Sequence, residues 1–261
     1  MWDQLRVMGA AMKIGLDIGS TTIKAVALND AGEIVFRRYE RHRAQIALLS
    51  EVLLHAVMAK FPGETFQLGI SGSAGMGLAE ELDIDFLQEV YATRVALRKL
   101  APKADVAIEL GGEDAKILFL TGAGGLEVRM NGTCAGGTGA FIDQMAALLE
   151  TDAPGLNKLA AGATTVYPIA ARCGVFAKTD VQPLINEGAR REDIAASIFQ
   201  AVVNQTISGL ACGKPIRGHV AFLGGPLHFL DQLRESFIKT LKLTPDETIV
   251  PENCKDDSRR I

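Results

Sequence analysis

The chain has 261 residues, enough for one large domain or two ordinary ones. Hydrophobic residues make up 48% and charged residues 22%, a balance typical of a folded globular protein, which excludes a disordered one. With 27 basic and 31 acidic residues the formal net charge is −4, which argues against nucleic acid as a partner. The densest basic stretch, Arg37 to Arg43, also contains Glu40, and we interpret it as a solvated face rather than a docking patch for an acidic protein.

No apolar run reaches the roughly 18 residues that a membrane helix needs. The best candidate, residues 160–177, contains Pro168 and Arg172. Residues 1–12 are too short and too weakly charged for a signal peptide, so we expect a short leader and a cytoplasmic protein that does not span a membrane. In that reducing compartment, four cysteines are more typical of ligands, catalytic groups or core residues than of disulfides.

Hydrophobic periodicity predicts an α/β protein with two lobes. The first lobe, residues 12–103, begins with a hairpin and continues with a strand at 33–39, a helix at 46–60, a strand at 66–71 and a helix at 90–100. The second, residues 104–251, has strands up to about residue 130, helices at 139–150 and 192–211, a strand at 219–223 and a helix that ends near 239. Residues 252–261 are polar, and we expect a truncated or disordered tail.

An internal repeat supports the division into two lobes. Residues 15–28 (GLDIGSTTIKAVAL) align with residues 107–120 (AIELGGEDAKILFL), so that acidic residues, a glycine, lysines and the final leucines coincide. Each copy has an apolar strand that ends in a carboxylate, a tight turn with glycine, and a second apolar strand, which predicts a β-hairpin. Chance resemblance of two such segments is the alternative.

The first hairpin has the chemistry of a phosphate site. Its turn offers backbone N–H groups and hydroxyls, Gly19 allows close approach, and the carboxylate of Asp17 is placed to hold hydrated Mg²⁺. No window fits the dinucleotide fingerprint G-x-G-x-x-G. The nucleotide-binding candidates of this hairpin are Gly19, Ser20, Thr21, Thr22 and Lys24.

The second hairpin is expected to face the first across a cleft and to clamp the β- and γ-phosphates of ATP. Glu109 and Glu113 are its candidate catalytic carboxylates beside Asp17, and Gly111 and Gly112 form its turn. A third turn follows the strand at 219–223 and would contact adenosine through Gly224 and Gly225. A glycine turn alone is more often only a turn, but the three in this order favour nucleotide binding.

These segments resemble the superfamily of acetate and sugar kinases, heat-shock chaperone ATPases and actin. The resemblance implies two ribonuclease-H-like lobes, an actin-like ATPase fold, with the nucleotide in the interlobe cleft. Two cysteine segments, residues 131–143 (NGTCAGGTGAFID) and 171–180 (ARCGVFAKTD), resemble the ATPase activators of 2-hydroxyacyl-CoA dehydratases and the ATPase subunits of benzoyl-CoA reductases. That family implies a homodimer that shares one [4Fe–4S] cluster and uses ATP hydrolysis to drive an electron onto a partner enzyme.

Counting thiols agrees with a shared cluster. A four-iron cluster needs four thiolates, and only Cys134 and Cys173 lie in glycine-rich contexts before helices, so a symmetric dimer would supply four. Buried or merely reactive thiols are the alternative; a zinc site is less favoured because the C-x₂₋₄-C pairs of such sites are missing. Cys212 is expected in the core and Cys254 to be incidental, and the four histidines receive no role.

The sequence therefore predicts a cytoplasmic, anaerobic ATPase that donates one electron to an iron–sulfur dehydratase or reductase. Ferredoxin or flavodoxin is the expected electron source. Glu109 and Glu113 stand where the family commonly has aspartate and glutamine, and after Asn253 the chain lacks the apolar strand and helix that the family implies. The alternatives are a phosphotransferase of the same superfamily, or a nucleotide-binding sensor module of a longer polypeptide.

Overall fold

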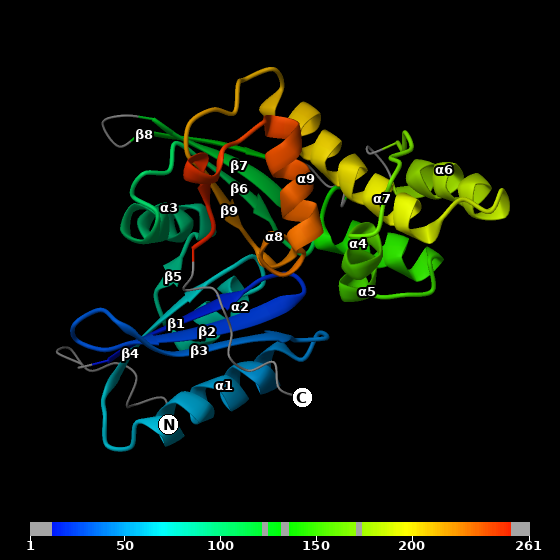
Figure 1. The fold of residues 1–261 in the computed structure, drawn as a ribbon. Helices are drawn as coiled ribbons and strands as arrows, with labels where there is room; N and C mark the ends of the chain where they lie inside the picture. Colours follow the sequence, from blue (N-terminus) through cyan, green and yellow to red (C-terminus); the bar gives the residue numbers. More distant parts are fainter. Residues whose placement is uncertain (1–11, 122–124, 132–135, 171–173, 252–261) are drawn as a thin grey trace. The chain divides into compact units, whose positions relative to one another are not determined.

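The computed structural model describes residues 12–121, 125–131, 136–170 and 174–251 (Figure 1). Within these residues the chain divides into two compact units, residues 12–98 and residues 99–251, each built on its own five-stranded sheet. The predicted tail, residues 252–261, lies outside the described residues.

The first unit has the strand order β3-β2-β1-β4-β5. Strands β1, β2 and β3 form an antiparallel meander, while β4 pairs parallel to β1 and β5 parallel to β4. The strands are β1 (Met12–Ile18), β2 (Thr22–Leu28), β3 (Ile34–Arg41), β4 (Phe66–Ser71) and β5 (Phe86–Leu87), and the helices are α1 (Ile46–Lys60), α2 (Met76–Leu82) and α3 (Glu89–Leu100).

The core of the first unit follows from the alternation of apolar residues along β1. Every second side chain of this strand is buried, because successive side chains of a strand point to opposite faces. Ile14, Leu16 and Ile18 thus share a core with Leu53 and Leu54 of α1. Figure 1 shows α1 lying along one face of this sheet.

The second unit has the strand order β10-β9-β6-β7-β8. Strands β6, β7 and β8 form the meander, β9 is parallel to β6, and β10 is parallel to β9. The strands are β6 (Val106–Leu110), β7 (Ala115–Thr121), β8 (Gly125–Met130), β9 (Val220–Leu223) and β10 (Thr248–Ile249). The two sheets therefore have the same topology, with β1 to β5 corresponding to β6 to β10.

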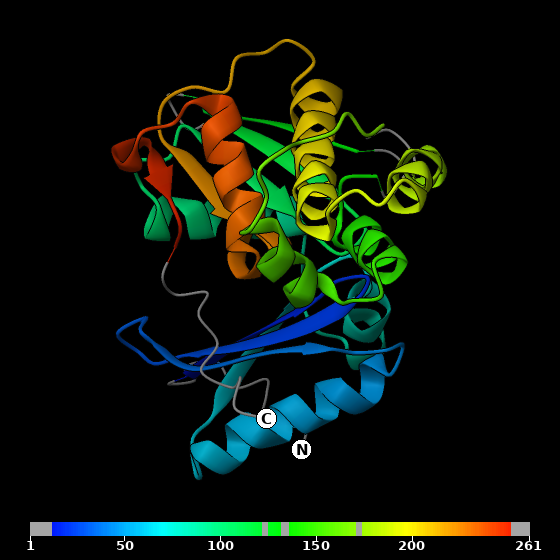
Figure 2. The ribbon, with the colours of Figure 1, turned by 45° about the vertical axis from the view of Figure 1, so that its right-hand side comes forward.

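Helices build most of the core of the second unit. Figure 2 shows α7 and α9 side by side along one face of the sheet. Buried side chains of α7, among them Ile198 and Phe199, pack in one cluster with Ile108 and Ile117 of the sheet. The helices are α4 (Gly139–Leu148), α5 (Ala153–Ala160), α6 (Gly174–Asn186), α7 (Arg191–Thr206), α8 (Gly225–Phe229) and α9 (Asp231–Leu241); a π-helical turn, η3 (Ile207–Ala211), follows α7, and a 3₁₀ turn, η4 (Pro245–Glu247), precedes β10.

Helix α7 with its π-helical turn spans Arg191–Ala211, and this span of 21 residues is apolar enough to cross a membrane by length and composition alone. This span was not among the candidates predicted from the sequence. Of its most apolar window, 61% is buried inside the protein, as in the core helix of a globular unit.

Two expectations about local structure were wrong, and several elements were not predicted. The helix expected to run from Gly225 to about residue 239 is two helices, α8 and α9, which are separated at Leu230. Helices α2, α5 and α6 and the short strands β5 and β10 were not predicted, and α6 carries Pro183 in its interior. Cys212, expected in the core, is exposed and ends the π-helical turn in a left-handed conformation (φ 45°).

Close backbone packing around Gly224 leads to a stability prediction. Gly224 has φ 86° and ψ 158°, a region that essentially only glycine occupies, and a Cβ there would collide with the Leu110 carbonyl oxygen. Gly213 also has positive φ (82°), but no atom lies within 4 Å of a Cβ built there. We expect Gly224→Ala to lower the free energy of unfolding by at least about 3 kcal/mol and Gly213→Ala by about 1 kcal/mol. Urea unfolding of both variants measures the difference, and equal losses would contradict a contribution from the collision.

Candidate functional site

Both predicted hairpins are present, and they match residue by residue. Asp17 pairs with Lys24 across β1 and β2, and Glu109 pairs with Lys116 across β6 and β7. The turns close in the same way: the Gly19 N–H donates to the Thr22 carbonyl (2.9 Å), and the Gly111 N–H donates to the Asp114 carbonyl (2.8 Å). The sequence repeat is therefore a repeat of register and turn geometry.

The first turn has a half-exposed ion pair beside it. Lys24 Nζ lies 2.6 Å from Asp17 Oδ2, and the two side chains are 33% and 38% exposed. Gly19, Ser20, Thr21 and Thr22 are all partly exposed. A Cβ at Gly19 would make only ordinary contacts, 3.6 Å to the Thr22 carbonyl oxygen and 3.9 Å to Lys24 Nζ. Packing within the chain therefore does not require glycine here, and the turn stays open to a ligand.

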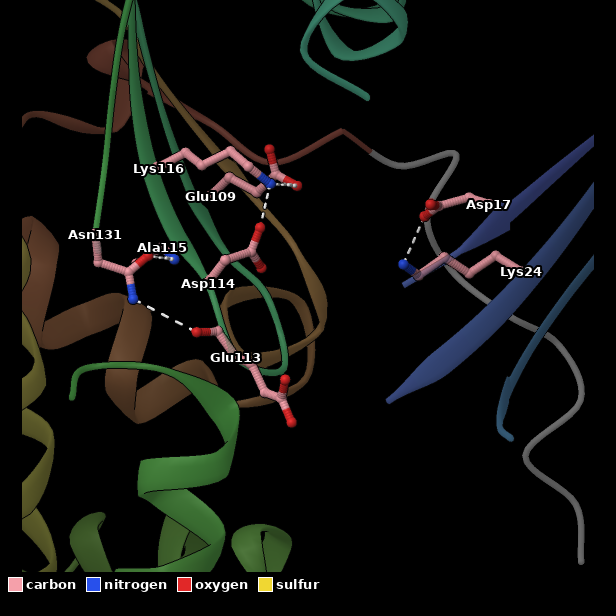
Figure 3. A network of polar contacts seen from close by, with 8 residues as sticks. All are labelled: Asp17, Lys24, Glu109, Glu113, Asp114, Ala115, Lys116 and Asn131. Carbon is pink, nitrogen blue, oxygen red and sulfur yellow. Dashed lines mark hydrogen bonds and ion pairs between the residues drawn. The ribbon is translucent and has the colours of Figure 1, made fainter. Parts of the chain in front are cut away.

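The second turn has a buried lysine at the same position. Lys116 is 3% exposed and forms ion pairs with Asp114 and with Glu109, whose Oε1 lies 3.8 Å from Nζ (Figure 3). A buried cation needs compensating negative charge, and the carboxylates of Glu109 and Asp114 both supply it to Lys116. A Cβ at Gly111 would collide with Asp114 Oδ1 and lie 3.2 Å from the Asp114 carbonyl oxygen, so a side chain here would displace the carboxylate that pairs with Lys116.

Glu113 differs from Glu109 in its surroundings. Glu113 is exposed, and in Figure 3 its side chain points away from Lys116. Among the described residues its carboxylate makes no hydrogen bond or ion pair, whereas Glu109 is 15% exposed and interacts with Lys116. Of the two predicted carboxylates, Glu113 is the one that faces solvent.

The third predicted turn packs onto the end of the first strand of its own unit. Gly224 follows β9, precedes Gly225 and Pro226 at the start of α8, and lies against the Leu110 carbonyl. The first unit has an equivalent turn that was not predicted from the sequence. Gly72 follows β4 with φ 93°, and a Cβ there would collide with the Ile18 carbonyl and the Asp17 carboxylate.

Cys134 lies outside the described residues, but the residues on both sides of its segment contact the second turn. Before it, Asn131 accepts a hydrogen bond from the Ala115 N–H through Oδ1 (2.8 Å) and donates through Nδ2 to the Glu113 carbonyl (3.4 Å) (Figure 3). After it, the Gly139 N–H at the start of α4 donates to the Gly111 carbonyl (3.0 Å). The predicted phosphate turn is thus bonded to both flanks of the predicted ligand segment.

Cys173 also lies outside the described residues, and its flanks are held as well. Ahead of it, the Ala170 N–H donates to Asp180 Oδ2 (2.7 Å), and Asp180 belongs to the helix α6 that follows. Helix α6 begins at Gly174, where a Cβ would lie 3.1 Å from Gln144 Oε1 and 3.8 Å from the ring of Phe141. The helices that follow the two cysteine segments, α4 and α6, therefore pack together near their first turns.

The stretch before Cys173 is fixed to α7 by a carboxylate. Asp193 is buried and accepts hydrogen bonds from the N–H groups of Thr164 (2.7 Å) and Thr165 (3.0 Å). These backbone donors hold the pKa of Asp193 below its usual value. One helical turn later, Ser197 Oγ accepts from the Tyr167 N–H (2.7 Å).

Four residues around the turns were not singled out by sequence reasoning. They make contacts that depend on tertiary structure, although a glycine directly after a strand was a usable signal for one of them. The four residues are His42, Gly72, Asp114 and Asn131.

Within the described ranges, no group of three or more His, Cys, Asp or Glu that could hold a metal is present.

Comparison with known proteins identifies the family. Residues 14–247 match the BadF/BadG/BcrA/BcrD ATPase family. The chain is similar to the (R)-2-hydroxyglutaryl-CoA dehydratase activating ATPase of Acidaminococcus fermentans, with 30% identity over 216 residues that cover 81% of this chain and 82% of that one. It is also similar to the activator of lactoyl-CoA dehydratase of Anaerotignum propionicum, with 30% identity over 210 residues, 78% of each chain.

A solved structure agrees with these relatives. The activator of the 2-hydroxyisocaproyl-CoA dehydratase from Clostridium difficile, with bound ADPNP, matches with a TM-score of 0.80 at 27% identity, over 92% of this chain and 88% of that one. The likeness confirms the predicted α/β fold of two ribonuclease-H-like lobes, the actin-like ATPase fold. With nearly its whole described length matched by the family model, the chain belongs to the BadF/BadG/BcrA/BcrD ATPase family.

Proposed function

We propose that this protein hydrolyses ATP and uses the reaction to deliver one electron to an iron–sulfur dehydratase or reductase, such as a 2-hydroxyacyl-CoA dehydratase. The observation that carries the proposal is the bonding of the Gly111–Ala115 turn to both flanks of the Cys134 segment. The relatives named as dehydratase activators supply the class of partner. A homodimer as the working form and ferredoxin or flavodoxin as the electron source complete the proposal.

The two hairpin turns would bind the phosphates of ATP. The first turn offers the N–H groups of Ser20 and Thr21 and the hydroxyls of Thr21 and Thr22, while Gly19 leaves room for the ligand. The similar activator with bound ADPNP supports a nucleotide as that ligand. Gly111 and Gly112 of the second turn, Lys24, and Gly224 and Gly225 of the third turn are the further contacts that we propose.

Asp17 fits the role of a Mg²⁺ partner. Its carboxylate stands at the end of β1, is 38% exposed, and is balanced only by Lys24 in the ion pairs of the described residues. A metal ion bound to phosphate keeps most of its water ligands, and a carboxylate that reaches those waters orients it. Lys24 would then be released to approach phosphate oxygens as a point charge.

Glu113 would act on the attacking water. Hydrolysis needs an oxygen of water to attack the γ-phosphorus, as the bond to the β-phosphate oxygen breaks and the proton of the water leaves. Glu113 is exposed at the tip of the turn, so its carboxylate is able to accept that proton or hold the water. Glu109 interacts with buried Lys116 and would maintain the turn.

Cys134 and Cys173 would hold the [4Fe–4S] cluster, with two thiolates from each of two chains. The described flanks fit this arrangement, because α6 starts directly after Cys173, α4 starts at Gly139, and the two helices pack together near their N-termini, which favour anionic groups. When bound, such a cluster supplies a one-electron redox centre. The chain itself would contribute the two thiolates, beside the hydrogen bonds that join the flanks of the Cys134 segment to the proposed phosphate turn.

The first test addresses Asp17. We expect Asp17→Asn to lower ATPase turnover at least about tenfold, because the metal ion loses a charged partner. The fold should persist, because Lys24 is one-third exposed and water compensates its charge. Steady-state phosphate release and thermal unfolding measure the two effects, and unchanged turnover would remove Asp17 from the site.

The second test separates the two glutamates of the second hairpin. Glu109→Gln should lower the free energy of unfolding by about 1–3 kcal/mol, because buried Lys116 loses one of its charged partners. Glu113→Gln should leave stability unchanged but lower turnover, since an amide accepts no proton. Urea unfolding and ATPase assays on both variants measure the two effects. A Glu109→Gln variant with unchanged stability and full activity would contradict the role of Glu109 as a partner of Lys116.

The third test counts iron. Anaerobically purified protein should contain about four irons and four sulfides per dimer, because each chain supplies two ligands. Cys134→Ala and Cys173→Ala should each lose the iron and the visible absorption, while Cys212→Ala is the matched control because Cys212 is an exposed thiol at the end of a helical turn. Four irons per monomer, or a full cluster in Cys134→Ala, would contradict the shared site.

A further inference from the structure

We propose that His42 is a positioning residue that sets the orientation of the peptide between Gly19 and Ser20 and thereby presents the Ser20 N–H to a nucleotide phosphate. The inference rests on the proposed function, because it assigns a role within the same phosphate turn. It concerns a histidine for which neither the sequence pattern nor the repeat gave a role. His42 follows β3 and lies 23 positions from Gly19, so only the folded structure brings them together.

Hydrogen bonds of both its backbone and its ring fix the position of His42. It is 5% exposed, its N–H donates to the Thr21 carbonyl (3.2 Å), and its own carbonyl accepts from the Gln45 N–H (2.7 Å). Its ring Nδ1 accepts from the Ala44 N–H (3.1 Å), while Nε2 lies 3.0 Å from the Gly19 carbonyl oxygen. A carbonyl only accepts and a backbone N–H only donates, so the ring is the neutral tautomer with its proton on Nε2.

The backbone after His42 is strained in a way that creates this arrangement. Arg43 and Ala44 have φ values of 47° and 63°, a left-handed backbone conformation that residues other than glycine rarely adopt. These two residues turn the chain back, so that the Ala44 N–H donates a hydrogen bond to Nδ1 of the His42 ring. Strain of this kind persists where surrounding contacts require it and gathers at functional sites.

The second hairpin provides an internal comparison. Gly111 is the repeat equivalent of Gly19, and its carbonyl also accepts from outside the turn, from the Gly139 N–H at the start of α4 (3.0 Å). In both turns, therefore, an external donor holds the carbonyl of the opening glycine. The first unit uses the His42 side chain where the second uses the backbone of a helix.

Peptide geometry connects this carbonyl to the ligand side of the turn. The C=O and N–H of a trans peptide point in opposite directions, so a Gly19 carbonyl held by His42 directs the Ser20 N–H away from His42. Glycine allows the peptide to rotate at little cost when the carbonyl is released. A rotated peptide would turn an oxygen toward the phosphate in place of a donor.

Two substitutions separate the two ring contacts. His42→Gln places an amide nitrogen near the position of Nε2 and keeps the donor to Gly19, while His42→Asn is shorter and keeps only an acceptor near Ala44. We expect His42→Asn to raise the dissociation constant for Mg-ATP about tenfold, as for a lost hydrogen bond to a charged group, and to leave that for adenosine unchanged. His42→Gln should bind Mg-ATP within about twofold of the original chain.

Calorimetry with Mg-ATP and with adenosine, beside the melting temperature of each variant, decides the matter. A folded His42→Asn variant with unchanged Mg-ATP affinity, or equal losses of affinity in the Gln and Asn variants, would overturn the role of His42. Asp17→Asn is measured in parallel: reduced turnover there with an unaffected His42→Asn variant rejects this inference alone. Unchanged Asp17→Asn turnover and unchanged His42→Asn binding together reject the proposed function as well.

Discussion

Backbone packing at the end of the first strand determines how each unit presents its turns. Gly72 lies against the Ile18 carbonyl and Gly224 against the Leu110 carbonyl; both glycines have positive φ, and a Cβ at either position would collide with that carbonyl. Because of this close contact, the turn that follows the parallel strand, β4 or β9, packs against the hairpin turn of the same sheet. Two turns thus meet at the carboxyl end of parallel strands, where α/β proteins usually bind ligands.

The two units share this frame but differ in how they hold the hairpin turn. In the first unit a side chain, His42, bonds the Gly19 carbonyl, and the ion pair beside the turn is half exposed. In the second unit α4 bonds the Gly111 carbonyl, and the lysine is buried between two carboxylates. The ion pair beside the first turn is therefore the more accessible to solvent, and the second turn is the one bonded to the flanks of the Cys134 segment.

Much of this was predictable from the sequence, since the repeat of strand, acidic residue, glycine turn and lysine fixed both hairpins and their cross-strand pairs. Other features depended on contacts or signals that local rules do not weigh. Proline normally ends a helix, so α6 with Pro183 inside was missed, whereas the Asp152 cap and early proline of α5 were readable signals. His42 gave no signal at all, because its partner is distant in the sequence. The ligand set of Cys134 and Cys173 remains a prediction, since both residues lie outside the described ones.

The anchoring of residues 131 and 139 on one turn has a thermodynamic consequence. Asn131 bonds to Ala115 and Glu113, and Gly139 bonds to Gly111, so folding brings residues 131 and 139 onto the same turn. The conformational entropy of bringing these two positions together is lost on folding and not when a ligand binds. A ligand that contacts the chain near these positions would need fewer favourable contacts for a given affinity, because preorganisation lowers the entropy lost on association. If a change loosened the turn, this conformational entropy would be lost when the ligand binds and no longer on folding.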